Sequence, residues 1–241
     1  MYLAREYLLE MGLHDLYILS PELALVSLAI GLILLDIIIT RKELIPILAV
    51  VGLVLPVSFA VALWFDPEIN TTTFNSGVLD GTLAVDKFGL FFKFLLIAVV
   101  GVVFLASTDH INKFPRFRTE YYALVMLSSA GMMLLASAVE FITIYVALEL
   151  TALPVAALVA FGREERSAEA GMKFLILSAI SSAILLYGMV IVYGFTGTTS
   201  LEEIASVWNE YRVLDNNIPF GSNAMIFGVI LIIAGFGFKI A

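Results

Sequence analysis

Residues 139–161 read VEFITIYVALELTALPVAALVAF and place one carboxylate, Glu149, near the middle of an apolar run. As an α-helix, this run is long enough to cross the hydrocarbon core of a bilayer, which is about 30 Å thick. A charge at the centre of a membrane helix costs roughly 2.5–3.5 kcal/mol, so such a residue usually faces a partner or a water-filled path. The stretch therefore predicts a membrane helix and makes Glu149 the first candidate functional residue.

The composition of the whole chain is that of a polytopic membrane protein. Of its 241 residues, 61% are hydrophobic and 14% are charged, and the mean hydropathy is +1.02. These values lie far outside the range of soluble globular domains. Runs of about 20 apolar residues recur along the chain, each long enough to span a bilayer. We therefore predict an all-α transmembrane bundle with seven membrane helices, at residues 21–39, 44–65, 88–106, 120–137, 139–161, 168–194 and 223–241.

The distribution of Lys and Arg predicts how these helices are oriented. Seven basic residues fall in the loops after the first, third and fifth predicted helices, and three fall on the opposite face. Positive charge marks the cytoplasmic side, so the N-terminus is expected outside. The first twenty residues lack an uninterrupted apolar core and a cleavage site, so we expect no signal peptide. The seven inner residues are Arg41, Lys42, Lys113, Arg116, Arg118, Arg163 and Arg166, and the outer ones are Arg5, Lys87 and Arg212.

Three lysines lie inside predicted helices. Lys93 and Lys173 are each about five residues from a helix end, where an ammonium group can reach the membrane surface by snorkelling. For Lys93, snorkelling is the favoured interpretation. For Lys173, snorkelling and function stay open, because hydroxyl groups that are able to relay a proton follow it on the same helix. Lys239 lies roughly 24 Å along its helix, too deep for snorkelling alone, so function is favoured over a purely structural ion pair.

Glu149 and Lys239 have the chemistry of a proton-handling pair. Burial favours the neutral form of each, whereas close approach restores both charges, so their separation would control their protonation. Pro154 lacks an amide hydrogen and frees the carbonyl of Leu150, which gives the Glu149 helix a place to bend. Tyr145, one turn before Glu149, is a candidate hydrogen-bond partner.

Several kinds of chemistry lack the residues that they require. The chain has no cysteine to ligate an iron–sulfur cluster, and His14 and His110 fall in the N-terminal segment and in a loop, which leaves no histidine pair for a haem. No glycine-rich phosphate loop follows a strand pattern. The net charge of −8 argues against a nucleic acid partner. We expect no metal, cofactor or redox centre on this chain.

Three stretches carry a resemblance to a known family. ITIYVALELTALPVAALVAF, RSAEAGMKFLILSAISSAILLYGMVIVYGFTGTTSLEEIA and IIAGFGFKIA closely resemble subunit N of the proton-translocating NADH:quinone oxidoreductase, respiratory complex I, whose mitochondrial counterpart is NADH dehydrogenase subunit 2. The resemblance runs over residues 141–241. It implies that Glu149 and Lys239 couple conformational change to proton movement, and it matches Lys173 to the family's helix-six lysine. The departures, at Gly171, Met172, Phe174 and Ser178, remove no ionisable group.

The resemblance also implies an organisation and a setting. Family members are about twice as long and contain two inverted five-helix repeats. This chain would hold the N-terminal half, as a fragment or a split gene, with helices one to three in residues 1–119 and the start of the antiporter-like unit in 120–241. The implied function is that of a membrane-arm subunit carrying part of a proton channel, in the plasma membrane of a prokaryote or an inner organelle membrane. NAD, FMN, iron–sulfur clusters and quinone would belong to partner subunits.

Two alternatives of other kinds stay open at this point. A subunit of an Mrp-type cation/proton antiporter or of a membrane-bound hydrogenase shares the Glu and Lys arrangement. The second alternative is an inert structural membrane segment in which Glu149 and Lys239 simply pair. The LLYG and YGFTG run favours subunit N over these alternatives, and co-purification with redox subunits and quinone-reductase activity would favour it further.

Overall fold

The computed structural model describes residues 15–38, 44–66, 81–111, 117–162, 164–214 and 219–240. Within these ranges the chain is helical, apart from turns and two isolated β-bridges. Seven stretches of helix there are long and apolar enough to cross a membrane, which confirms the predicted all-α bundle. The helices are α2 (Ser20–Ile38), α3 (Ile45–Gly52), α4 (Val54–Phe65), α5 (Lys87–Ile111), α6 (Arg118–Ser137), α7 (Phe141–Val159), α8 (Glu165–Thr196), α9 (Leu201–Leu214) and α10 (Pro219–Ile240).

The second membrane span is broken into two helices, α3 and α4. Pro56 has no N–H to offer the carbonyl of Gly52, so the regular hydrogen-bond ladder stops there. The amide of Leu53 bonds instead to the carbonyl of Val50 at 3.2 Å, which forms a tight turn between the two helices. The span therefore continues across the break from Ile45 to Phe65.

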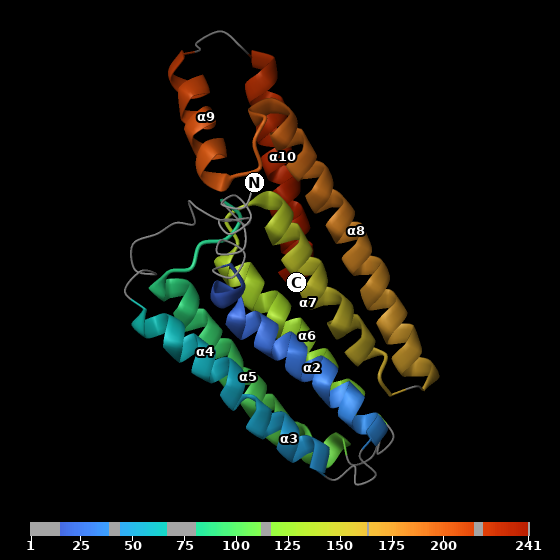
Figure 1. Cartoon of the computed structure of the whole chain (residues 1–241). Helices are drawn as coiled ribbons and strands as arrows, with labels where there is room; N and C mark the ends of the chain where they lie inside the picture. Colours follow the sequence, from blue (N-terminus) through green and yellow to red (C-terminus); the bar gives the residue numbers. More distant parts are fainter. Residues whose placement is uncertain are drawn as a thin grey trace, which may run out of the picture.

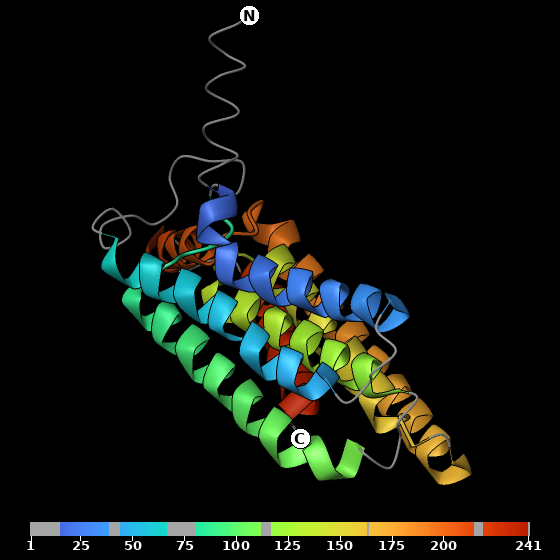
Figure 2. The same cartoon turned by 60° about the horizontal axis from the view of Figure 1, so that its bottom comes forward.

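The helices form two packed groups that meet at α6 and α7 (Figures 1 and 2). The larger core lies among helices α2 through α6. It includes Phe104 and Tyr122, whose rings meet edge to face with 4.8 Å between their centroids. A second core joins α7, α8 and α10 around Phe141, Leu185 and Met189. Because α6 belongs to the first core and also packs along α7, it joins the two groups. The functional division at residues 119 and 120 stays a prediction.

Helix α9 differs from the sequence expectation, which left this region in an outer loop. It is a surface helix with one apolar edge, from which Ile204 and Trp208 pack against the second core. Glu202 and Glu203 lie in its first turn, where a negative charge is favourable near the positive end of the helix dipole. The sequence does have apolar residues at helical spacing in this region. The acidic residues among them made the segment resemble an exposed loop, so the helix was not predicted.

A short backbone ladder ties three connecting segments together at the end of the bundle where α5 and α7 begin. The amide of Ala84 donates to the carbonyl of Ser137 at 2.7 Å, and that of Leu201 donates to the carbonyl of Val139 at 3.1 Å. Glu140 reinforces the ladder, because its carboxylate accepts a hydrogen bond from the Thr199 hydroxyl at 2.5 Å. The entry to α7 is thereby fixed to both helix groups.

Candidate functional site

The structure brings Glu149 and Lys239 together. The Nζ of Lys239, on α10, lies 2.7 Å from the Oε1 of Glu149, on α7. The Lys239 side chain is 9% exposed and that of Glu149 is 27% exposed. The two residues are 90 positions apart in the sequence, so the contact is made by helix packing and not by local structure. The arrangement is an ion pair between two membrane-spanning helices, as the sequence led us to expect, and its role in proton movement stays a prediction.

Ser182 on α8 completes this arrangement as a third member. Its hydroxyl lies 2.5 Å from the same Glu149 Oε1 that Lys239 contacts, and 2.8 Å from the backbone carbonyl of Ser178. A serine hydroxyl has one hydrogen, so it donates to only one of these acceptors at a time. The Ser182 hydroxyl therefore has two orientations. One donates to Glu149 and stabilises its ionised form, and the other donates to Ser178 and leaves the Glu149 oxygen free to accept a proton.

Close packing of α8 against α10 sets the register of this site. A Cβ at Gly235 would lie 2.7 Å from Leu185 Cβ and 2.8 Å from its backbone, so only glycine permits this approach. The hydroxyl of Ser181 donates to the carbonyl of Gly235 at 2.7 Å and is buried. Lys239 follows Gly235 by one turn, and Ser182 directly follows Ser181. The close contact between α8 and α10 therefore positions both polar partners of Glu149.

Helix α7 is held closely against α6 just beyond Glu149. A Cβ at Gly131 would lie 2.8 Å from the backbone nitrogen of Thr151, and the Ser128 hydroxyl donates to the carbonyl of Thr151 at 3.2 Å. Pro154 lies inside α7 and leaves the carbonyl of Leu150 without its helical donor. The carboxylate thus sits one residue from a weak point in a helix that is otherwise firmly packed.

Tyr145 does not hydrogen-bond to Glu149, contrary to the expectation from the sequence, and Ser182 occupies that role. The Tyr145 side chain instead lines a cavity of about 550 Å³ between α7 and α8, together with Tyr193, Thr198 and Thr199. Its lining is mostly apolar, and Thr198 and Thr199 lie at the end nearest the backbone ladder. The cavity comes within one helical turn of Glu149.

Lys173 contacts Glu169 and does not join the pair of Glu149 and Lys239. Its ammonium lies 2.5 Å from the carboxylate of Glu169, one turn away on α8, and both side chains are well exposed, at 70% and 64%. Ser182 is roughly 14 Å further along the same helix, by the 1.5 Å rise per residue. The assignment of Lys173 to proton movement stays a prediction.

The snorkelling interpretation of Lys93 is wrong. Its side chain is 1% exposed and its Nζ lies 2.7 Å from the Oε1 of Glu22 on α2, so it pairs inside the bundle. The physical reason is that a buried carboxylate was within reach at the same depth. Glu22 follows the start of α2 by two residues and Lys93 follows the start of α5 by six, and both helices begin at the same end of the bundle. Their position near the same end of the bundle was the signal available in the sequence.

Ser182→Ala is expected to lower proton pumping severalfold and to shift its pH profile, while the protein still folds. The substitution removes one of the two donors to Glu149 Oε1, and a hydrogen bond to a charged group contributes about 1.5–3 kcal/mol. The measurement is dye-reported proton uptake into proteoliposomes across a pH series. Ser181→Ala is the matched control, which removes the bond to Gly235 and should lower thermal stability without moving the pH profile. Ser182→Thr should restore wild-type behaviour, and an unchanged pH profile in Ser182→Ala would count against the role.

Comparison with known proteins agrees with this helical membrane fold. Residues 138–241 match the family described as NADH:quinone oxidoreductase/Mrp antiporter, TM. NADH-quinone oxidoreductase subunit N of Dehalococcoides mccartyi is 36% identical over 223 residues, which cover 92% of this chain and 44% of that protein. Subunit N of Heliobacterium modesticaldum is 35% identical over 93% of this chain and 44% of its own length. The chain spans less than half the length of these curated relatives.

Two solved structures share the fold. Respiratory complex I from Thermus thermophilus contains a chain that superposes with a TM-score of 0.66 at 24% identity, over 90% of this chain and 43% of that one. An archaeal membrane-bound sulfane sulfur reductase contains one that superposes with a TM-score of 0.71 at 22% identity, over 92% and 44%. Along most of its length the chain is therefore similar to the first part of NADH-quinone oxidoreductase subunit N. It has a multi-pass membrane fold, and its residues 138–241 match the family described as NADH:quinone oxidoreductase/Mrp antiporter, TM.

Proposed function

We propose that this chain is part of a membrane-arm subunit of a proton-translocating NADH:quinone oxidoreductase, or complex I-like assembly, and that Glu149 and Lys239 move protons within it. The observation that carries the proposal is the contact between Lys239 Nζ and Glu149 Oε1 across α7 and α10, with Ser182 on the same oxygen. Similarity at 36% identity to subunit N supports the assignment to this kind of complex.

Charge balance explains how the pair would work. In contact, the Lys239 ammonium and the Glu149 carboxylate stabilise each other, so the lysine keeps its proton and the glutamate takes none up. When they separate, each is left as an uncompensated charge in a medium of low polarity, so Lys239 favours losing a proton and Glu149 favours gaining one. A small movement of either helix is therefore converted into proton release at one residue and uptake at the other. The weak point at Pro154 is where α7 would bend.

The redox chemistry would lie on partner chains. We propose that NAD, FMN, iron–sulfur clusters and quinone bind other subunits, because this chain has no cysteine and only two histidines. Within the described residues, no group of three or more His, Cys, Asp or Glu side chains is placed to hold a metal ion. Electron transfer elsewhere would drive the conformational change that separates Glu149 from Lys239.

We propose a prokaryotic plasma membrane as the location, with the N-terminus outside the cytoplasm. The proposal rests on the basic loop residues, of which Arg41, Lys42, Lys113, Arg116 and Arg163 lie outside the described residues. The absence of native cysteine makes a direct test possible. In intact cells, an impermeant maleimide should label Asn70→Cys and spare Asn112→Cys, and the reverse pattern would refute this orientation.

The second candidate is a subunit of an Mrp-type cation/proton antiporter or a membrane-bound hydrogenase. It is favoured by the description of the matching family, which includes Mrp antiporters, and by the shared fold of the archaeal sulfane sulfur reductase. Purification of the tagged full chain from its native membrane separates the candidates. Co-purification of redox subunits with NADH:quinone reductase activity coupled to proton uptake supports the first. Sodium-dependent proton exchange without quinone reduction would overturn it.

A further inference from the structure

The N-terminal helices hold a second buried ion pair, between Glu22 on α2 and Lys93 on α5. Their charged atoms are 2.7 Å apart, and as whole residues they are 3% and 0% exposed. Two buried charges are costly in a membrane protein, and apolar residues of the same size often replace such a pair without loss of stability. The residues lie upstream of the stretch that matches the antiporter family, residues 138–241, and none of the steps proposed for Glu149 uses them.

The polar atoms around this pair are incompletely bonded within the described residues. The Oε2 of Glu22 has no hydrogen-bond partner there, and Glu22 is the one group paired with the Lys93 ammonium, which has three hydrogens to donate. The hydroxyls of Ser20 and Ser137 are also buried without a partner. Buried polar groups are almost always satisfied, and ordered water does so where protein groups do not. The pair is therefore suited to hold water against its charges.

The two unpaired hydroxyls lie on segments at the end of the bundle where α2 and α5 begin. Ser20 precedes Glu22 by two residues at the start of α2. The Ser137 hydroxyl lies 3.5 Å from where a Cβ of Gly89 would be, and Gly89 is one turn before Lys93 on the same face of α5. Toward the same end of the bundle, Ile18, Leu63, Val85 and Leu90 form a small buried apolar cluster, called here the apolar layer.

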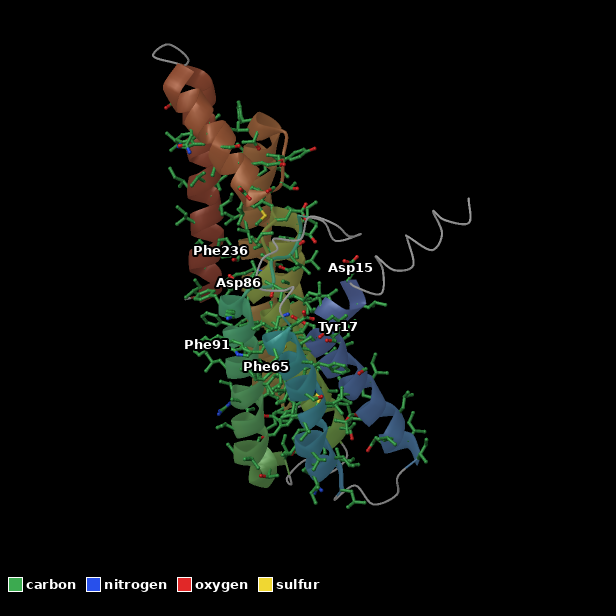
Figure 3. The ribbon with its side chains drawn as sticks, turned by 60° about the vertical axis from the view of Figure 1, so that its left-hand side comes forward. Asp15, Tyr17, Phe65, Asp86, Phe91 and Phe236 are labelled. Carbon is green, nitrogen blue, oxygen red and sulfur yellow. The ribbon has the colours of Figure 1, made fainter. Side chains whose placement is uncertain are left out.

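The titratable groups facing this layer are mostly acidic. Figure 3 shows Asp15 and Tyr17, from the segment before α2, and Asp86, just before α5, near this end of the N-terminal helices. Asp86 accepts a hydrogen bond from the amide of Gly89 at 2.6 Å, and the pKa of Tyr17 is raised by burial and by the nearby carboxylate of Asp66. The others, among the residues that the structure describes at this end, are Glu140, bonded to Thr199 and Thr143, and one base, Lys87. An acidic rim of this kind attracts protons toward the apolar layer.

We propose that Glu22 and Lys93 form a second proton-binding site, which exchanges a proton with the aqueous phase at the end of the bundle where α2 and α5 begin. In the loaded state the pair is a carboxylate and an ammonium. On release Lys93 first moves away from Glu22, as proposed for Lys239 and Glu149. An Nζ–H bond of Lys93 then breaks, the proton passes to a bound water and on to the acidic rim, and a neutral amine and a carboxylate remain. Uptake reverses these steps, so the net charge of the site alternates between zero and minus one.

Lys93→Arg separates this role from a purely structural one. Arginine keeps the positive charge and the ion pair, but it does not release a proton at any accessible pH. The measurement is the number of protons taken up by the purified resting complex between alkaline and neutral pH, followed with an indicator dye, together with its melting temperature. We expect Lys93→Arg to assemble and to lose the proton that the wild type takes up. Lys87→Arg, at the exposed start of the same helix, is the matched control and should keep wild-type uptake.

A second variant covers the case in which arginine does not fit. Glu22→Gln with Lys93→Met removes both charges together, so neither is left uncompensated, and it too should assemble without the proton. Wild-type proton uptake in either assembled variant would overturn the proposal, and failure of both to assemble would mark the pair as structural and overturn it as well. Uptake by the resting complex needs no turnover, so its result is independent of whether Glu149 and Lys239 pump protons.

Discussion

Glu149→Gln, made in the full chain within its complex, should lower the rate of proton pumping by about tenfold or more. Glutamine keeps the size of the side chain and a hydrogen bond to Ser182, but it has no charge to balance Lys239 and no proton to exchange. Charge-assisted bonds contribute about 1.5–3 kcal/mol, and 1.4 kcal/mol corresponds to a factor of ten in rate. The measurement is the initial rate of proton uptake into proteoliposomes, with assembly checked by gel filtration.

The control for this variant is Glu165→Gln. Glu165 lies in the first turn of α8, where its side chain is exposed and far along the helix from Ser182, so the same chemical change should leave pumping intact. If Glu149→Gln pumps at the wild-type rate while fully assembled, the carboxylate is not part of the proton route. The inert structural interpretation of the pair would then be the correct one.

Gly235→Ala should cause a large loss of stability at the contact between α8 and α10. The added Cβ would meet the backbone nitrogen and Cα of Leu185 at 2.8 Å, and backbone atoms have no rotamer by which to move away. Overpacking of this kind costs about 1–3 kcal/mol, and here it pushes α10 from α8 and carries Lys239 away from Glu149. We expect a melting temperature several degrees lower and a loss of pumping in the fraction that assembles.

Gly237→Ala is the matched control, because a Cβ at Gly237 would have no atom within 4 Å in the described residues. It lies two positions further along α10 and should keep the wild-type melting temperature. Equal melting temperatures for the two variants would show that the close approach at Gly235 is not what holds the helices together. The contact between Lys239 and Glu149 would then need another support.

Hydropathy was sufficient to predict the membrane helices, because the apolar length of each run fixes whether it can span a bilayer. Depth along the helix was also sufficient to single out Glu149 and Lys239, since a charge far from either membrane surface needs a partner. Depth does not give the rotation of one helix against another. For that reason the sequence pointed to Tyr145, one turn before Glu149 on the same helix, as the hydrogen-bond partner of Glu149. The partner in the structure is Ser182, which reaches Glu149 from α8.

The pairing of Lys93 was missed for a related reason. Its position near a helix end made snorkelling sufficient as an explanation, and Glu22, equally near an end, had been counted within the first apolar run. Comparing the depth of acidic and basic residues across all helices that begin on one side would have placed the two together. Lys173, by contrast, makes an exposed contact with Glu169 on its own helix.

The central claim is that Glu149 and Lys239 exchange protons and do not merely hold α7 against α10. Infrared difference spectroscopy of the complex during turnover, in H2O and D2O, tests it directly, because it detects a carboxyl group when it becomes protonated. We expect a carboxyl band that appears during turnover, shifts in D2O, is absent from Glu149→Gln and persists in the resting state of Lys239→Met. A Glu149 carboxylate that stays ionised throughout turnover in the wild type would contradict the claim.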